Sequence, residues 1–114
     1  MSDQSEVMKF EQQQRITKLS QAIRDGAKLR PQCTGFTFRD GRSCALGAAY
    51  EAAFGYPTDD IYFSGDIDGE MARKLHEKFN IPWSFSLPRE VGMNMNDAGM
   101  TREAIADRLE AMGY

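Results

Sequence analysis

Cys44 is the residue whose position in this sequence best fits a chemical role. It follows Ser43 and opens the run "CALGAA", whose small residues favour a helix. A thiol at the first turn of a helix lies close to unpaired backbone amides, whose partial positive charge lowers its pKa. Cysteine hydrolases place their nucleophile in this way. Cysteine is also among the residues most often buried in a core, and the sequence alone favours that second interpretation.

A catalytic cysteine needs a base, and the only histidine of the chain is His76. His76 follows Leu75 in "EMARKLHEKF", and helical spacing predicts that it lies on or near the solvent-exposed face. Papain-like cysteine peptidases carry their histidine on a strand, so the similarity to them ends where Cys44 meets its helix. Asn96 and Asp97 are candidates to orient a base, although both residue types also form turns through local backbone bonds.

An acidic cluster lies between residues 57 and 72, a stretch without lysine or arginine. A calcium loop beginning at Asp66 would have Met71 where the sixth position requires glycine. A loop beginning at Ser64 would have Leu75 where the twelfth position requires glutamate. The cluster therefore fits a solvent-exposed loop with a helix cap better than a cation site, and a weak site stays open. Two cysteines and one histidine are also too few for the usual zinc site, so we expect no metal and no cofactor. The cluster comprises Asp59, Asp60, Asp66, Asp68 and Glu70.

A second candidate site is the segment 81–95, which is rich in large apolar side chains and is predicted to be irregular. Such side chains either contact a partner or seal a small core, and methionines in particular adapt to different partners. The residues that we predict to contact a partner are Trp83, Phe85, Leu87, Met93 and Met95.

The elements that must position these residues are mainly helical. Apolar residues recur at intervals of three and four in four parts of the chain, which is typical of amphipathic helices. Ser43, Asp68 and Thr101 are the predicted N-caps of the last three helices. The small residues around Gly47 are expected to let another helix approach closely. The predicted helices cover residues 6–29, 44–54, 68–79 and 101–112. The last two are expected to bury Met71, Leu75, Phe79, Ile105, Leu109 and Met112.

Between the first two helices the pattern changes to an extended one. Phe36 and Phe38 alternate with polar residues, and Asp40-Gly41 is a strong signal for a tight turn. This predicts one short strand or at most a small hairpin. We therefore expect residues 1–114 to form a single, mainly α domain of about four helices, with residues 1–5 disordered.

The composition of the 114-residue chain excludes several functions. Its net charge of −3 weighs against general binding to nucleic acids or anionic membranes, which requires a basic surface. No apolar stretch is long enough to span a membrane, and the polar N-terminus lacks the apolar centre of a secretory signal. We expect a cytoplasmic protein in which Cys33 and Cys44 are free thiols.

Three segments together carry a resemblance. The chain has "CALGAA" at residues 44–49, Asn-Asp at residues 96–97, and then "TREAIADRLE". This layout resembles a loose group of small bacterial and phage proteins that share a Cys-x-x-Gly-Ala helix start, a later Asn-Asp and a closing amphipathic helix. The resemblance covers residues 41–112, and the group has no assigned activity. It implies that Cys44 and Gly47 lie close to Asn96-Asp97, in an active site or in a structural network of hydrogen bonds.

Two functional hypotheses follow from the sequence. The first is a non-enzymatic protein-interaction module of bacterial or phage origin, which contacts a protein partner or a second copy through segment 81–95. One version is an acidic inhibitor that occupies a basic nucleic-acid channel. The second is a small hydrolase or transferase with Cys44 as nucleophile and the amides of the helix start stabilising the developing anion. The second requires His76 or Asp97 near Cys44, and the lack of a complete catalytic set favours the first.

Overall fold

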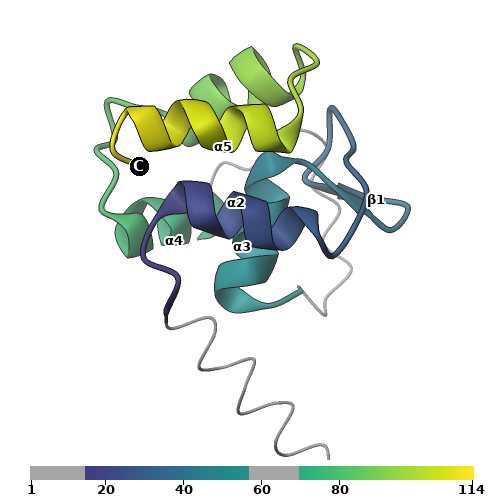
Figure 1. Ribbon diagram of the computed structural model, residues 1–114, viewed down its shortest axis with the longest axis horizontal. Helices are drawn as coiled ribbons and strands as arrows, with labels where there is room; N and C mark the ends of the chain where they lie inside the picture. The colour runs from purple at the N-terminus through teal and green to yellow at the C-terminus, as the bar shows by residue number, and fades with distance from the viewer. Residues whose placement is uncertain (1–14, 57–69) are drawn as a thin grey trace, which may run out of the picture.

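The computed structural model describes residues 15–56 and 70–114, which form a small, mainly helical domain (Figure 1). The described helices are α2 (Leu19–Ala27), α3 (Ala45–Phe54), α4 (Glu70–Phe79), the π-helix η1 (Pro88–Asn96) and α5 (Arg102–Ala111). Strands β1 (Phe38–Arg39) and β2 (Arg42–Ser43) pair as an antiparallel hairpin. The predicted fold class, a mainly α domain with a small hairpin, is confirmed.

Helix α3 is the centre of the domain. Nearly all of its residues are apolar and buried, as is typical of a central helix, and its one charged residue, Glu51, pairs with Arg30 at 2.8 Å. Helix α2 crosses it at Gly26, where an added Cβ would overlap the carbonyl of Ala48. The predicted close approach of a second helix therefore occurs one residue after Gly47. Gly47 itself faces the backbone of Thr37 just before the hairpin.

The remaining helices cover α3 from other directions. Helix α5 lies beside α2, and η1 packs against both α3 and α5 (Figure 1). The burial predicted for α4 and α5 is confirmed except at Met112, which is 47% exposed because α5 ends at Ala111. The largest apolar side chains that are fully buried are Leu19, Ile23, Leu46, Leu75, Leu87, Val91, Ile105 and Leu109.

The first predicted helix is interrupted. Residues 16–18 are not helical, and Lys18, with φ −127° and ψ 144°, is the extended N-cap of α2. The break lets Ile16 enter the core, where it is 2% exposed, and the β-branched Ile16 and Thr17 favour extended backbone. The prediction of one continuous helix is therefore wrong at this point. Residues 6–14 lie outside the described part of the chain.

The local turn and cap signals are mostly confirmed. Asp40 and Gly41 both have positive φ, 52° and 76°, as a two-residue type I′ hairpin turn requires. Thr101 caps α5 by accepting a hydrogen bond from the Ala104 amide at 3.1 Å. The predicted cap at Ser43 is wrong by one residue. Cys44 is the N-cap of α3, and Ser43 stays in β2. The predicted cap Asp68 lies outside the described residues.

Segment 81–95, predicted to be irregular, contains a helix. Residues 88–96 form the π-helix η1, in which bonds such as Asp97 N–H to Gly92 C=O, at 2.9 Å, span five residues. Pro88 lies in the first turn, where a missing N–H costs little. The buried residues Met95 and Asn96 lie four and five residues after Val91, whereas an α-helix favours three and four. The search for a 3.6-residue period therefore misses this helix.

None of the helices in the described ranges has the length and apolar character required to cross a membrane.

Candidate functional site

The Cys44 thiol is buried in the core at the start of α3. Its residue is 5% exposed, and its Sγ accepts a hydrogen bond from the Gly47 amide at 3.3 Å. Burial raises the pKa of the thiol to about 11, even though the amides of Gly47 and Leu46 act in the opposite direction. A thiol of this kind stays protonated at neutral pH. Cys44 is thus a protonated cap of α3 in the folded protein, and it is not an activated thiolate.

Because this thiol is buried, we predict that the protein loses stability at alkaline pH. The pKa of Cys44 is raised from an ordinary value of 9.0 to about 11 in the folded protein, so the stabilisation is complete below pH 9. It is lost as the pH rises from 9 to 11, because in that range the Cys44 thiol ionises in the unfolded chain but stays protonated in the folded protein. We expect the loss to reach about 2 to 3 kcal/mol.

Urea unfolding between pH 8 and pH 11 measures this effect as the difference between wild type and Cys44→Ala. Subtraction removes the contribution of the tyrosines and lysines, which titrate in the same range in both proteins. Parallel pH profiles for the two proteins would contradict a buried, neutral Cys44.

His76 is buried, and the prediction that it lies near solvent is wrong. The residue is 3% exposed, its Nδ1 lies 3.0 Å from the Ile81 carbonyl, and its Nε2 accepts from the Leu87 amide at 3.4 Å. Trp83 stacks on the ring with centroids 4.0 Å apart. The chain reverses after Asn80, which has a φ of 54°, and folds back over His76. Both ring nitrogens therefore hold the connection between α4 and η1, and neither is bonded to Cys44.

Asn96 joins the end of η1 to two distant segments of the chain. It is fully buried, and its Oδ1 accepts from Gln32 Nε2 at 2.9 Å and from the Ala45 amide at 3.0 Å. Its Nδ2 donates to the Cys33 carbonyl at 2.9 Å and to Asp97 Oδ1 at 3.3 Å. These four bonds use the full capacity of the carboxamide. The structure therefore places Asn96 against the start of the Cys44 helix.

The Asn96 carboxamide takes the place of a missing ladder bond. Gln32 and Ser43 form a parallel β-bridge, and the Cys33 amide donates to the Ser43 carbonyl at 3.0 Å. The next bond of a parallel ladder would join the Ala45 amide to the Cys33 carbonyl. The two segments diverge here, and Asn96 bonds to both groups instead.

Asp97 completes this arrangement on the solvent side. Its Oδ1 accepts a hydrogen bond from the Gly35 amide at 2.8 Å, in addition to the bond from Asn96. It thereby fastens the loop before β1 to the end of η1. The hydrogen bonds of Asn96 and Asp97 hold backbone segments together, and none of them orients an imidazole.

Arg102 is a site residue that sequence reasoning missed. It is 8% exposed, and its Nη1 donates to Ser43 Oγ at 3.0 Å. Its Nη2 donates to the carbonyls of Arg30 at 2.6 Å and Ala27 at 3.4 Å, where α2 ends. Burial lowers the pKa of this guanidinium. No local pattern marks Arg102 as buried, because all its partners lie about 60 or more residues earlier in the chain.

The five predicted contact residues of segment 81–95 have different environments. Trp83 is 62% exposed and Met93 is 61% exposed. Phe85 is half-buried against the Tyr114 ring. Leu87 and Met95 are buried core residues, so their assignment to a partner surface is wrong. Leu87 is the N-cap of η1 and Met95 lies near its C-terminal end, and both side chains are in the core.

Trp83 borders a groove at the end of α4. The groove has a volume of about 610 Å³ and combines apolar surface with the polar side chains of α4 and its C-terminal turn. Its lining residues are His76, Glu77, Asn80, Ile81, Pro82 and Trp83.

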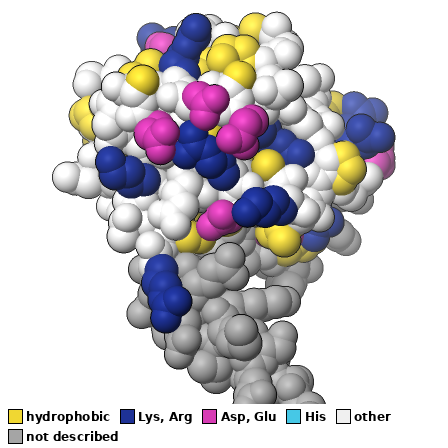
Figure 2. Space-filling model, viewed as in Figure 1, with side chains coloured by type: hydrophobic (Ala, Val, Ile, Leu, Met, Phe, Trp, Pro, Cys, Tyr) yellow, Lys and Arg dark blue, Asp and Glu magenta, His cyan; other side chains and the backbone are white. Residues whose placement is uncertain are grey.

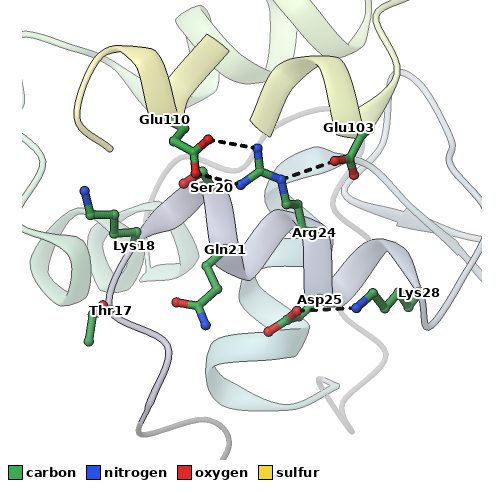
Figure 3. A pocket seen from close by; sticks show the side chains of 9 residues that line it. All are labelled: Thr17, Lys18, Ser20, Gln21, Arg24, Asp25, Lys28, Glu103 and Glu110. Carbon is green, nitrogen blue, oxygen red and sulfur yellow. Dashed lines mark hydrogen bonds and ion pairs between the residues drawn. The ribbon is translucent and has the colours of Figure 1, made fainter. Parts of the chain in front are cut away.

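A second groove, of about 480 Å³, lies between α2 and α5 (Figure 3). Arg24 extends across it and pairs with Glu103 at 3.3 Å, Asp107 at 2.6 Å and Glu110 at 3.1 Å. Hydrogen bonds to Asp107 and Glu110 raise the pKa of Arg24. The three carboxylates are well exposed, so each pair adds little stability. Figure 2 shows carboxylates gathered around a basic side chain at the centre of this face, with further Lys and Arg side chains around them.

The predicted acidic cluster lies mostly outside the described residues. Only Glu70 is described, and it pairs with Arg73 at 2.9 Å. Within residues 15–56 and 70–114, no group of three histidine, cysteine or carboxylate side chains is arranged to hold a metal ion.

No protein-family model matches the chain, and no match was found among curated proteins or solved structures.

Proposed function

We propose that this protein is an interaction module that binds a protein partner, or a second copy of itself, through the surface around Trp83. The observation that carries the proposal is the 62% exposure of Trp83 on a segment held in place by the buried His76. Tryptophan is the residue type most enriched among those that dominate binding energy at interfaces. A ring already fixed by stacking loses little conformational freedom on binding.

The surroundings of Trp83 support this role. The adjacent groove supplies a concave surface beside a projecting aromatic ring. Met93, 61% exposed on η1, adds a second large apolar side chain from the same segment of the chain. Side chains of this type at the surface of a folded domain are stabilised when a partner covers them.

The alternative, a hydrolase or transferase using Cys44, lacks support from these contacts. Cys44 is buried with a raised pKa, and both nitrogens of His76 are engaged by backbone groups. The carboxamide of Asn96 likewise has no free donor or acceptor. An enzyme built on Cys44 would have to break the network that holds its own core together.

The negative net charge of the chain favours a partner with a basic contact surface. The chain has a net charge of −3, which favours a basic partner over an acidic one. This version of the proposal includes the acidic inhibitor expected from the sequence, and its bacterial or phage origin rests on the resemblance of residues 41–112.

Substitution of Trp83 tests the proposal. We expect Trp83→Ala to weaken binding by about 30-fold or more, equivalent to about 2 kcal/mol, and Met93→Ala to weaken it less. Leu29→Ala is the matched control, because Leu29 is 58% exposed but lies beyond α2, outside the segment 81–95. Sedimentation velocity over a range of concentrations measures self-association. Quantitative capture from host lysate, with the three variants in parallel, measures binding to other proteins.

The single tryptophan makes Trp83 its own reporter. Its fluorescence emission should shift to shorter wavelength when a partner or a second copy covers it. Capture of the same proteins by wild type and Trp83→Ala, or a monomer that captures nothing, would contradict the proposal.

A further inference from the structure

Cys33 and Cys44 lie next to each other in space. Gln32 and Ser43 form a parallel β-bridge, and the two cysteines are the next residues on the two segments. Opposite residues of a parallel pair point to the same face, on strands about 4.8 Å apart. Disulfide bonds join residues whose Cα atoms lie about 4.4 to 6.8 Å apart. The ladder is intact up to the Cys33 amide, and the segments diverge only beyond it, where the Asn96 carboxamide lies between the Cys33 carbonyl and the Ala45 amide.

The electrostatic surroundings agree with this proximity. Both thiols act on the pKa of the Arg102 guanidinium, and Cys33 also acts on the pKa of Cys44. Arg102 donates to the Ser43 carbonyl and hydroxyl, so it lies beside the peptide that leads directly into Cys44.

The two thiols differ in their access to solvent. Cys33 is only partly buried, and its Sγ donates to the Phe36 carbonyl at 3.3 Å. Cys44 is 5% exposed and acts as the cap of α3. A dissolved oxidant therefore reaches Cys33 first, and Cys44 is the second thiol beside it.

We propose that Cys33 and Cys44 form a reversible intramolecular disulfide when the protein meets a peroxide. Burial raises the pKa of the Cys33 thiol, so its sulfur loses a proton as it attacks one peroxide oxygen. The O–O bond breaks, and the released hydroxide takes that proton to become water. Cys33 is then a sulfenic acid. The Cys44 sulfur attacks the Cys33 sulfur, the S–O bond breaks, and the hydroxyl group leaves as water with the Cys44 proton. Two thiols and one hydrogen peroxide give one disulfide and two waters.

The disulfide would change the start of α3. Its formation draws Cys44 Sγ toward Cys33 and away from the Gly47 amide, so the first turn of the helix loses its cap. The change occurs where Asn96 joins the end of η1 to the start of α3. Oxidation thus acts on the packing of η1, the helix that carries Met93.

Mass spectrometry of the intact wild-type protein tests the proposal. The protein is treated with hydrogen peroxide at low concentration, quenched with N-ethylmaleimide under denaturing conditions, and digested. The expected result is a monomer two hydrogens lighter, with no maleimide added, a linked Cys33–Cys44 peptide, and recovery of both thiols in dithiothreitol.

Cys33→Ser and Cys44→Ser are the matched variants, and circular dichroism checks that each is folded. Neither should show the mass loss, and Cys44→Ser should accumulate Cys33 sulfenic or sulfinic acid. Wild-type protein that gives sulfinic acid at Cys33, a dimer linked through Cys33, or two unreacted thiols would overturn the proposal.

Discussion

Asn96→Ala should lower the free energy of unfolding by about 2 to 5 kcal/mol, because it leaves two buried backbone groups without partners. The Ala45 amide and the Cys33 carbonyl both bond to the carboxamide of this fully buried residue. Gln32 keeps its bond to the Met100 carbonyl, so its amide is not the main source of the loss. Urea unfolding followed by circular dichroism measures the difference.

Asn94→Ala is the control for this prediction. Asn94 is exposed on the same helix, η1, so its replacement should change the free energy of unfolding by less than about 0.5 kcal/mol. Asn96→Asp offers a finer test, since it keeps an oxygen for the Ala45 amide but loses the donor to Cys33. We expect it to be more stable when its carboxyl group is protonated. An Asn96→Ala protein as stable as Asn94→Ala would show that the carboxamide does not hold these segments together.

Gly26→Ala should destabilise the domain by about 1 to 3 kcal/mol, or prevent its folding, although alanine is the better helix former. The new Cβ would overlap the carbonyl carbon and oxygen of Ala48, which belong to the backbone of α3 and cannot rotate away. The gain in helix propensity, about 1 kcal/mol, is smaller than the cost of moving two helices apart. Thermal unfolding monitored by circular dichroism gives the shift in Tm.

Gly92→Ala is the matched control for the helix crossing. A Cβ at Gly92 would lie 3.8 Å from Leu46 Cδ1, which is ordinary contact, so this variant should be neutral or slightly more stable. Comparison of Gly26→Ala with Gly92→Ala separates the general effect of alanine in a helix from the steric overlap of a Cβ at Gly26 with α3. Equal stability of the two variants would mean that α2 does not need a glycine to cross α3.

The oxidation proposal and the binding proposal both involve the helix η1. Asn96, at its C-terminal end, bonds to the start of α3, which carries Cys44, while Met93 lies exposed in the middle of the same helix. Each proposal is nevertheless tested separately. The disulfide is measured by mass on the protein alone, and the binding role of Trp83 is measured with both thiols reduced.

Several features could be predicted from short stretches of sequence, because the physics that sets them is local. The Asp40-Gly41 turn requires two residues that tolerate positive φ, and Asp-Gly supplies them. Thr101 accepts its capping bond from Ala104, only three residues away. Met71, Leu75 and Phe79 share one face through helical periodicity alone.

Only the tertiary structure decided the character of the candidate site. Whether Cys44 is an activated nucleophile or a buried cap depends on desolvation, which the rest of the fold provides. His76 and Arg102 are polar residues on otherwise amphipathic helices, and their burial requires partners from other parts of the chain. The sequence by itself determined α3, α4, α5, the turn of the hairpin and the main apolar faces, but neither η1 nor the break before α2. The fold decided which polar groups meet inside, because a buried polar group is stable only where distant segments bring it a partner.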